Sequence, residues 1–293
     1  KLASGEKEWI LTSGWNKSVM NADDYRAYVG GTSGLIYGYV NDGFYKVEDF
    51  EYFDSKSRTW KLKEGVVDSS PLSDTPRPGN AKFKKLTPVD PNSSNPYQLT
   101  EADRTVIGNT TPKFSGGFGL NATYKGFDLS MFFNFMYDFD VFNANKVMLT
   151  TWADNHENNF GMEVASDKRW RNFDDMGNEI RYSPELLAEF NKNATMWNPT
   201  SIGKPISMSY AVEDGSFLRL NSATLGYTLP QGWTKKAGLN KVRFYVAGSN
   251  LFTITGYSGY DPEVDIATGL TPNIDNNRYP RSRTYTFGAQ LTF

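Results

Sequence analysis

The last eleven residues of the chain alternate strictly between apolar and polar positions. Tyr285, Phe287, Ala289, Leu291 and Phe293 share one face, and threonine, glycine and glutamine occupy the other. A period of two is typical of a strand with one apolar and one wet face. An ordinary amphipathic strand has this pattern as well. The aromatic residue at the very end nevertheless favours a transmembrane β-barrel, whose last strand carries an apolar band to lipid.

Two longer runs in the middle of the chain alternate in the same way. Residues 114–124 and 127–137 are separated only by Lys125 and Gly126, which predicts a β-hairpin with a two-residue turn. Each run has about eleven residues, as a tilted membrane-crossing strand requires, whereas soluble strands have about five or six. We expect one face of the second run to meet lipid and the other to meet the lumen. The lipid-facing set is Phe127, Leu129, Met131, Phe133 and Phe135, and the lumen-facing set is Asp128, Ser130 and Asn134.

The connections between predicted strands alternate between short and long. Further strands are predicted at 6–15, 35–45, 217–229 and 241–252, and a short helix at 183–190 with Ser183 as its N-cap and Pro184 in its first turn. Short connections fall at 125–126 and 230–240, and long loops at 46–112, 139–215 and 253–281. Outer-membrane barrels have short periplasmic turns and long extracellular loops. We therefore expect the three long segments to face outward.

Composition excludes several classes of protein. No apolar run reaches the roughly 18 residues of a membrane-spanning helix. The chain has no cysteine, which excludes disulfides and thiol chemistry, and its net charge of −2 argues against nucleic-acid binding. The chain begins at Lys1 without a signal peptide, so we expect it to be the carboxy-terminal part of a longer exported polypeptide.

Several ordered blocks resemble the carboxy-terminal barrel of SusC/RagA-type TonB-dependent transporters. The most specific block is the pair SNLFT at 249–253 and YSGYDPE at 257–263. The other blocks are DRTVIGNTTPKFSGGFG at 103–119, YKGFDLS at 124–130, EDGSFLRL at 213–220, TLGY at 224–227 and YPRSRTYTFG at 279–288. One departure is that residues 82–95 lack the closely spaced acidic residues that many family members carry before the IGN block. We expect no calcium-type site in this loop, because such a cage needs several carboxylates at short intervals.

The resemblance implies an all-β fold, a transmembrane antiparallel β-barrel of about 22 strands with a plugged lumen, of which this chain supplies about seven. Residues 1–293 are then the carboxy-terminal portion, and the plug and the amino-terminal strands belong upstream. The resemblance also implies active import of a glycan or oligopeptide across the cell outer membrane. The implied partners are the upstream part of the transporter, a SusD-like surface lipoprotein, TonB, membrane lipid or lipopolysaccharide, and the substrate. By the same analogy, Tyr285, Phe287, Leu291 and Phe293 form the barrel assembly signal.

Two other functions are compatible with parts of this pattern. A passive porin-like or structural barrel has the same strands, but the long loops and the 257–263 block argue against it. A soluble all-β binding module is disfavoured by the length of the aromatic-ended strands.

We expect no enzyme, metal site or cofactor. The single histidine, His156, lies in a polar loop, and the adjacent Asp174 and Asp175 point in different directions, so neither predicts catalysis. Asp261, Glu263 and Asp265 alternate like a weak cation site, but a polar loop cap is the favoured interpretation.

Substrate contacts are expected in the second long loop, where aromatic rings stack on sugars or pack on peptide side chains. The arginines of this loop can pair with an anionic group. These roles compete with packing of the loop on itself and with simple solvation. The candidates are Trp152, Trp170, Trp197, Arg169 and Arg171.

Overall fold

The chain folds into two compact units in a computed structural model, which describes residues 7–15, 23–73, 75–151, 160–164, 167–202, 206–264 and 269–293. We call them the strand unit and the mixed unit. The strand unit comprises Thr111–Val141, Glu213–Val264 and Asn277–Phe293. The mixed unit comprises Lys1–Thr110, Phe142–Val212 and Asp265–Asn276. The all-β character expected from the alternating runs is confirmed.

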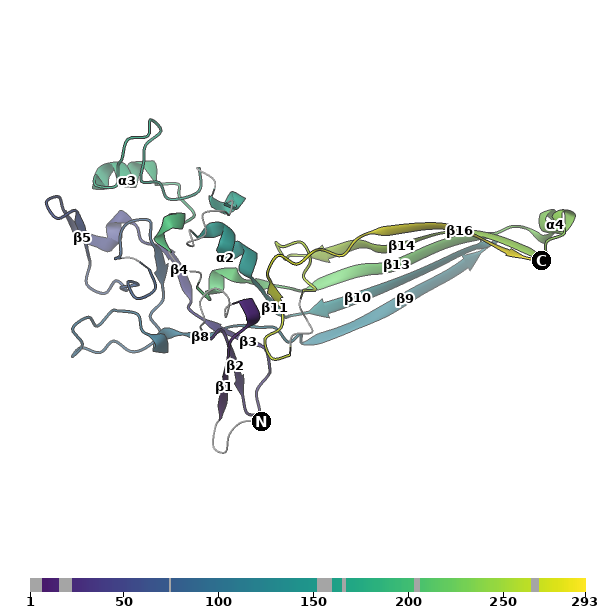
Figure 1. Cartoon of the computed structure of the whole chain (residues 1–293), viewed down its shortest axis with the longest axis horizontal. Coiled ribbons are helices and arrows are strands. Elements are labelled where there is room, and N and C mark those ends of the chain that lie inside the picture. Colours follow the sequence, from purple (N-terminus) through teal and green to yellow (C-terminus); the bar gives the residue numbers. More distant parts are fainter. Residues whose placement is uncertain are drawn as a thin grey trace. The chain divides into compact units, whose positions relative to one another are not determined.

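The strand unit is built on one sheet of five long strands, each antiparallel to its neighbours (Figure 1). Their order is β16-β14-β13-β10-β9. All five were predicted from the sequence, and only β14 extends clearly beyond its predicted run, which ended at residue 252. The strands are β9 (Phe114–Tyr124), β10 (Phe127–Tyr137), β13 (Phe217–Thr228), β14 (Lys241–Thr255) and β16 (Thr284–Thr292).

The predicted hairpin turn is confirmed in its residues and in its backbone. Lys125 and Gly126 join β9 to β10, both with positive φ (45° and 89°), and Phe127 pairs with Tyr124. Two positive φ values in succession match the right-handed twist of paired strands. The other short connection, between β13 and β14, contains α4 (Gln231–Thr234) and a 3₁₀ turn at Lys235–Ala237.

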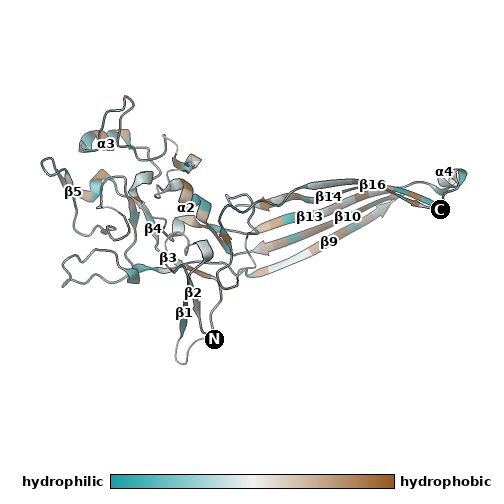
Figure 2. Ribbon diagram, viewed as in Figure 1, coloured by the Kyte–Doolittle hydropathy of each residue, from teal (hydrophilic) through white to brown (hydrophobic). Residues whose placement is uncertain are grey.

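The two faces of the sheet differ in chemistry, and each long strand carries both hydrophobic and hydrophilic residues (Figure 2). On one face the ring of Phe127 lies 4.5 Å from that of Tyr227. On the other, Asp128 of β10 reaches across β13 to Arg243 of β14, with contacts of 2.9 Å from Nε to Oδ1 and 2.5 Å from Nη2 to Oδ2. Gly226 lies under this ion pair, because a Cβ there would come within 2.4 Å of Arg243 Nη2.

The mixed unit is made of short elements. Its four-stranded sheet has the order β1-β2-β3-β8, and β4 pairs with β7, β5 with β6, and β11 with β15. The strands are β1 (Glu8–Leu11), β2 (Tyr25–Tyr28), β3 (Leu35–Gly38), β4 (Asn41–Phe44), β5 (Phe50–Asp54), β6 (Thr59–Leu62), β7 (Ala81–Phe83), β8 (Thr105–Asn109), β11 (Asp140–Asn143), β12 (Val212–Asp214) and β15 (Ile274–Asp275). The run predicted as one strand at 35–45 is thus divided between β3 and β4.

The expectation of irregular loops at 46–112 and 139–215 is corrected by this unit. Both segments contain strands or helices, and together they supply most of a buried core that also includes Trp15, Tyr25 and Ile274. Sequence alternation missed them because each strand has only two to five residues, and several pair with distant segments, as β8 does with β3. The outward position of these segments stays a proposal.

Two short α-helices lie in the described part of residues 142–212 of the mixed unit. They are α2 (Ala144–Thr150) and α3 (Pro184–Phe190), the second being the helix predicted at 183–190. Pro184 occupies the first turn as expected, while Ser183 is the N-cap by position without a capping hydrogen bond from its side chain. Within the described ranges, no helix has both the length and the apolar character needed to cross a lipid bilayer.

Candidate functional site

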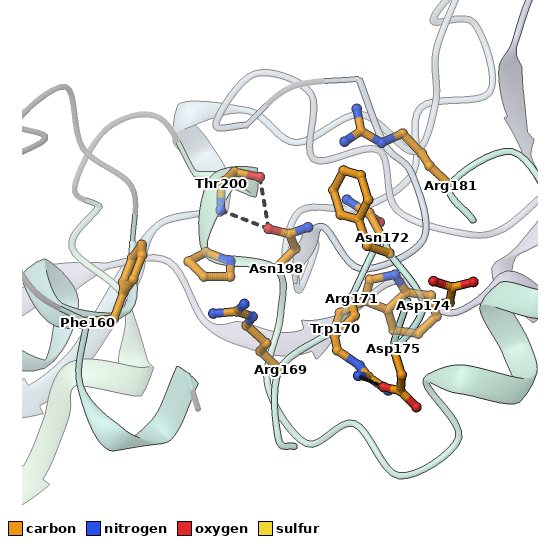
Figure 3. Close-up of a pocket in the computed structure, with 12 residues that line it drawn as sticks. Phe160, Arg169, Trp170, Arg171, Asn172, Asp174, Asp175, Arg181, Asn198 and Thr200 are labelled. Atoms are coloured by element: carbon orange, nitrogen blue, oxygen red, sulfur yellow. Dashed lines mark hydrogen bonds and ion pairs between the residues drawn. The ribbon is translucent and has the colours of Figure 1, made fainter. Parts of the chain in front are cut away.

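The mixed unit has a cavity of about 520 Å³ around residues 169–175 (Figure 3). This volume lies within the range of small-molecule sites. A smaller cavity of about 260 Å³ adjoins it through Asn172, Arg181, Asn198 and Thr200, which line both. The residues that line the larger cavity are Phe160, Arg169, Trp170, Arg171, Asn172, Phe173, Asp174, Asp175, Arg181, Asn198, Pro199 and Thr200.

Main-chain pairing holds the central segment of this cavity in place. The Trp170 amide donates to the Met196 carbonyl (2.8 Å), and the Ile180 amide donates to the Asn172 carbonyl (2.9 Å). Asn191, at the end of α3, accepts from the Arg171 amide (2.6 Å) and donates to the Arg171 carbonyl (2.9 Å). The cavity wall is therefore a fixed backbone that presents side chains.

A tight turn follows this segment and uses the Asp174 carboxylate fully. Oδ1 accepts from the amides of Met176 (2.9 Å) and Asn178 (2.8 Å), and Oδ2 accepts from Asn178 Nδ2 (2.9 Å). The side-chain bond from Asn178 and these amide bonds lower the pKa of Asp174. Its charge stabilises the turn, which agrees with the expectation that Asp174 and Asp175 form no catalytic pair.

The three arginines of the cavity have different partners. Arg171 Nη1 lies 2.6 Å from Asp175 Oδ1, and Arg181 Nε lies 3.2 Å from Glu179 Oε1. Arg169 Nη1 donates to the carbonyl oxygen of Val164 at 3.3 Å. Among the residues that the structure describes, no carboxylate lies within ion-pair distance of Arg169.

The predicted contact residues separate into two groups. Arg169, Trp170 and Arg171 line the cavity together, although the Trp170 side chain is only 3% exposed and packs edge-on against Phe44 at 5.7 Å. Trp197 is 2% exposed in the main core, where its Nε1 donates to the Thr150 carbonyl at 3.1 Å, so its visible role is packing. Trp152 and His156 lie outside the described residues.

Sequence reasoning missed several residues of the cavity. Phe173, Asn172, Arg181, Asn198 and Thr200 belong to it but were not singled out. The position of Phe173, an aromatic residue close in sequence to Trp170 and its flanking arginines, was a usable signal. No local pattern connects residues 198–200 to residue 172, because tertiary packing alone brings them together.

The loop at 82–95, where no calcium-type site was expected, holds an ammonium group instead. Lys85 Nζ donates to Thr87 Oγ1 (2.8 Å) and the Gln98 carbonyl (3.0 Å), and lies 3.4 Å from Asp103 Oδ2. Burial raises the pKa of Asp103, but hydrogen bonds from Thr87, Thr100 and Leu86 outweigh it and hold that pKa well below its usual range. Within the described part of the chain, no group of three or more acidic or histidine side chains is arranged for a metal ion.

The 261–265 motif is likewise held by arginines. Asp261 Oδ1 lies 2.5 Å from Nη2 of the buried Arg219, and Glu263 Oε1 lies 2.8 Å from Arg281 Nη2. These ion pairs compensate the charges of the two carboxylates, as a polar loop cap requires. Asp265 lies outside the described residues.

The four residues proposed as the assembly signal lie on the last strand and just beyond it. Tyr285, Phe287 and Leu291 belong to β16 and Phe293 follows its end, and all four side chains are exposed. Strand β16 pairs with β14 along its length and is an edge of the five-stranded sheet.

Comparison with known proteins finds relatives over most of the chain. A scan against protein-family models gives no match. TonB-dependent receptor P3 of Formosa agariphila is 32% identical over 266 residues, which cover 89% of this chain and 22% of the relative. TonB-dependent receptor SusC of Bacteroides thetaiotaomicron is 37% identical over 86 residues, 29% of this chain and 8% of the relative. The chain spans about a fifth of the length of P3.

Solved structures of similar fold are those of the RagAB peptide transporter. One has a TM-score of 0.63 at 20% identity, covering 100% of this chain and 25% of the matched chain. The importer in its open-open state has a TM-score of 0.60 at 20% identity, with the same coverage of both chains. At this identity the likeness concerns the fold.

Proposed function

We propose a function from the family of the chain. The chain belongs to the SusC/RagA-type TonB-dependent transporters, corresponds to part of the length of its relatives, and lies in the cell outer membrane. The complete protein imports a nutrient across that membrane, driven through TonB, and does no covalent chemistry on its cargo. The observation that carries this proposal is the 32% identity to a TonB-dependent receptor over 89% of the chain.

The two units have different tasks in this proposal. The five long strands form part of the barrel wall, with Phe127, Leu129, Met131, Phe133 and Phe135 toward lipid, and the Asp128–Arg243 pair toward the lumen. A charge toward lipid at mid-membrane depth would cost about 2–4 kcal/mol, which favours this orientation. The three segments 46–112, 139–215 and 253–281 face outward.

The cavity around residues 169–175 is the proposed capture site for the cargo, a glycan or an oligopeptide. Its support is a fixed backbone, exposed aromatic rings and several hydrogen-bonding side chains in one concave place. A SusD-like lipoprotein covers the external side. The cargo then passes from this surface toward the plug of the complete protein.

The test is uptake by cells that carry the complete receptor, compared with cells that lack it and with cells that lack TonB. The proposal expects uptake of the cargo to need both proteins. Uptake that needs the receptor and continues without TonB would contradict the proposal and indicate a passive channel.

A further inference from the structure

Among the described residues that line the cavity, the guanidinium group of Arg169 has no carboxylate partner. Asp174 is used by its turn, Asp175 pairs with Arg171, and Arg181 pairs with Glu179. Arg169 lines the same cavity, and its side chain donates to a carbonyl oxygen, that of Val164, within the described part of the chain. A guanidinium group has five N–H donors in a planar fork that fits a carboxylate or a sulfate. The cavity is therefore ready for one anionic group at Arg169.

Aromatic side chains lie in the same cavity in contact with solvent. Phe173 is 48% exposed, and Phe160 is also exposed, although both are large apolar groups. Beside them, Asn172, Asn198 and Thr200 offer amide and hydroxyl groups. A sugar ring has an apolar C–H face that stacks on an aromatic ring and hydroxyl groups that bond to amides, so this mixture suits a carbohydrate.

The main chain of the cavity has little left to offer to a peptide. The amides of Trp170, Arg171 and Asp174 already donate to Met196, Asn191 and Asn178. The carbonyls of Arg171 and Asn172 are also occupied. A peptide bound in an extended form obtains much of its affinity from main-chain hydrogen bonds to a free strand edge. Recognition at this cavity rests on side chains, which favours a glycan over an oligopeptide.

We propose that this cavity binds an acidic sugar unit of the cargo, with its carboxylate or sulfate ester on the Arg169 guanidinium and its ring against Phe173. The proposal rests on the proposed import function and names its substrate class. Arg169 is the residue that selects acidic over neutral glycans.

The experiment measures binding to the complete receptor, purified with its lipoprotein partner in detergent. The probes are oligogalacturonates with their methyl esters, sulfated galactan oligosaccharides with their desulfated forms, and an acidic peptide. We expect an acidic oligosaccharide to bind at least about tenfold more tightly than its matched neutral form, since a charge-assisted contact is lost. The uronate and sulfate arms identify which anion the site accepts.

Variants connect this preference to the residue. Arg169→Gln is expected to remove the preference for the acidic form, and Arg169→Lys to keep part of it, because lysine retains the charge without the planar fork. Lys168→Gln is the matched control, since it removes one charge from an exposed neighbour that does not line the cavity, and should bind as the parent does.

Three results would overturn the proposal. The first is equal binding of the acidic and neutral forms. The second is a receptor that binds no acidic oligosaccharide, whether or not it binds the acidic peptide. The third is an Arg169→Gln variant that keeps the preference for the acidic form. TonB-dependent uptake of cargo is measured separately. Uptake that survives any of these results leaves the import function in place and removes only the substrate class.

Discussion

The two units use the same kinds of apolar side chain in opposite ways. In the strand unit, aromatic residues stand on the outside of the sheet, as Phe287 and Phe118 do. In the mixed unit, Phe83 and Phe142 are fully buried in a core that collects segments from Trp15 to Ile274. Lipid covers the apolar face of a membrane-facing sheet, whereas a unit that faces water must bury its own apolar side chains. The same composition thus gives two architectures with different solvents.

Charges follow the same division. In the strand unit, Asp128 and Arg243 meet across an intervening strand over a glycine, on the face opposite the aromatic rings. In the mixed unit, Lys85 is enclosed by loop oxygens. Long strands fix the first pair through register, and a folded loop fixes the second group through tertiary contacts. The two units should therefore fail independently when their key residues are changed.

The largest expected effect is in the core of the mixed unit. Trp197→Ala should destabilise that unit by about 3–5 kcal/mol, because it empties a buried site and leaves the Thr150 carbonyl without its donor. The measurement is protease cleavage within the mixed unit across a urea series, on the complete receptor. Trp233→Ala is the matched control, since Trp233 is 66% exposed and should matter little. If the five-stranded sheet also unfolded in the Trp197→Ala variant, the two units would not be independent in stability.

A change of comparable size is expected in the strand unit. Arg219 is buried on β13 and holds Asp261 at 2.5 Å, with Glu263 at 3.7 Å. Arg219→Ala leaves two carboxylates without this cation, which should lower stability by about 3–5 kcal/mol. The measurement is the temperature at which the folded receptor, seen as a separate band on a gel in detergent, is lost. Arg283→Ala removes an exposed arginine of the same unit and serves as the control. Equal losses of stability in the two variants would show that the buried position of Arg219 has no special effect.

The amino-terminal sheet of the mixed unit should respond to pH through Asp24. Burial raises the pKa of Asp24 from 3.8 to about 6, against hydrogen bonds from Ser13 that lower it. Because the folded-state pKa lies above the unfolded value, stability is greatest below pH 3.8 and falls as pH rises through about 6. The free energy of unfolding falls in total by about 3 kcal/mol between these two pKa values.

Hydrogen exchange of β1 and β2 measures this response, comparing Asp24→Asn with the parent at each pH. The variant should lose the decline between pH 4 and 7, since asparagine does not ionise and still accepts from the Ser13 amide. Identical pH profiles for the two proteins would show that Asp24 is not the titrating group.

The smallest effect on stability is expected at the carboxy terminus. Deleting Phe293 removes one exposed aromatic residue after β16, so an assembled barrel should tolerate it. The amount of receptor in the outer membrane should fall, because recognition of the last strand precedes folding, while uptake per assembled molecule stays near normal. Normal abundance with lost uptake would show that Phe293 acts in transport.

The sequence predicted the strand unit far better than the mixed unit, for a physical reason. Strict alternation over eleven residues is a local property, and it located β9, β10 and their turn at Lys125 and Gly126 to the residue. Each strand of the mixed unit has two to five residues, too few for a period to show. Several of its strands, such as β3 and β8, pair because distant segments meet in one core, and the sequence of one segment does not indicate its partner.

The candidate site shows the same limit. The cluster of Arg169, Trp170 and Arg171 was found because the three residues are adjacent in sequence. Trp197 looked equivalent to Trp170 but lies inside the main core, since nothing local distinguishes a tryptophan that packs from one that lines a cavity. Asn198 and Thr200 join the site only through folding.

The central claim is that the mixed unit serves the external surface while the short turns of the strand unit face the periplasm. The chain has no cysteine of its own, so single cysteines report cleanly in a receptor otherwise free of them. Met176, which is 86% exposed and follows the cavity residue Asp175, reports on the mixed unit, and the exposed Trp233 reports on a short turn of the strand unit. A membrane-impermeant maleimide on intact cells should label Met176→Cys at once and Trp233→Cys only after the outer membrane is opened. Labelling of Trp233→Cys alone on intact cells would contradict the account.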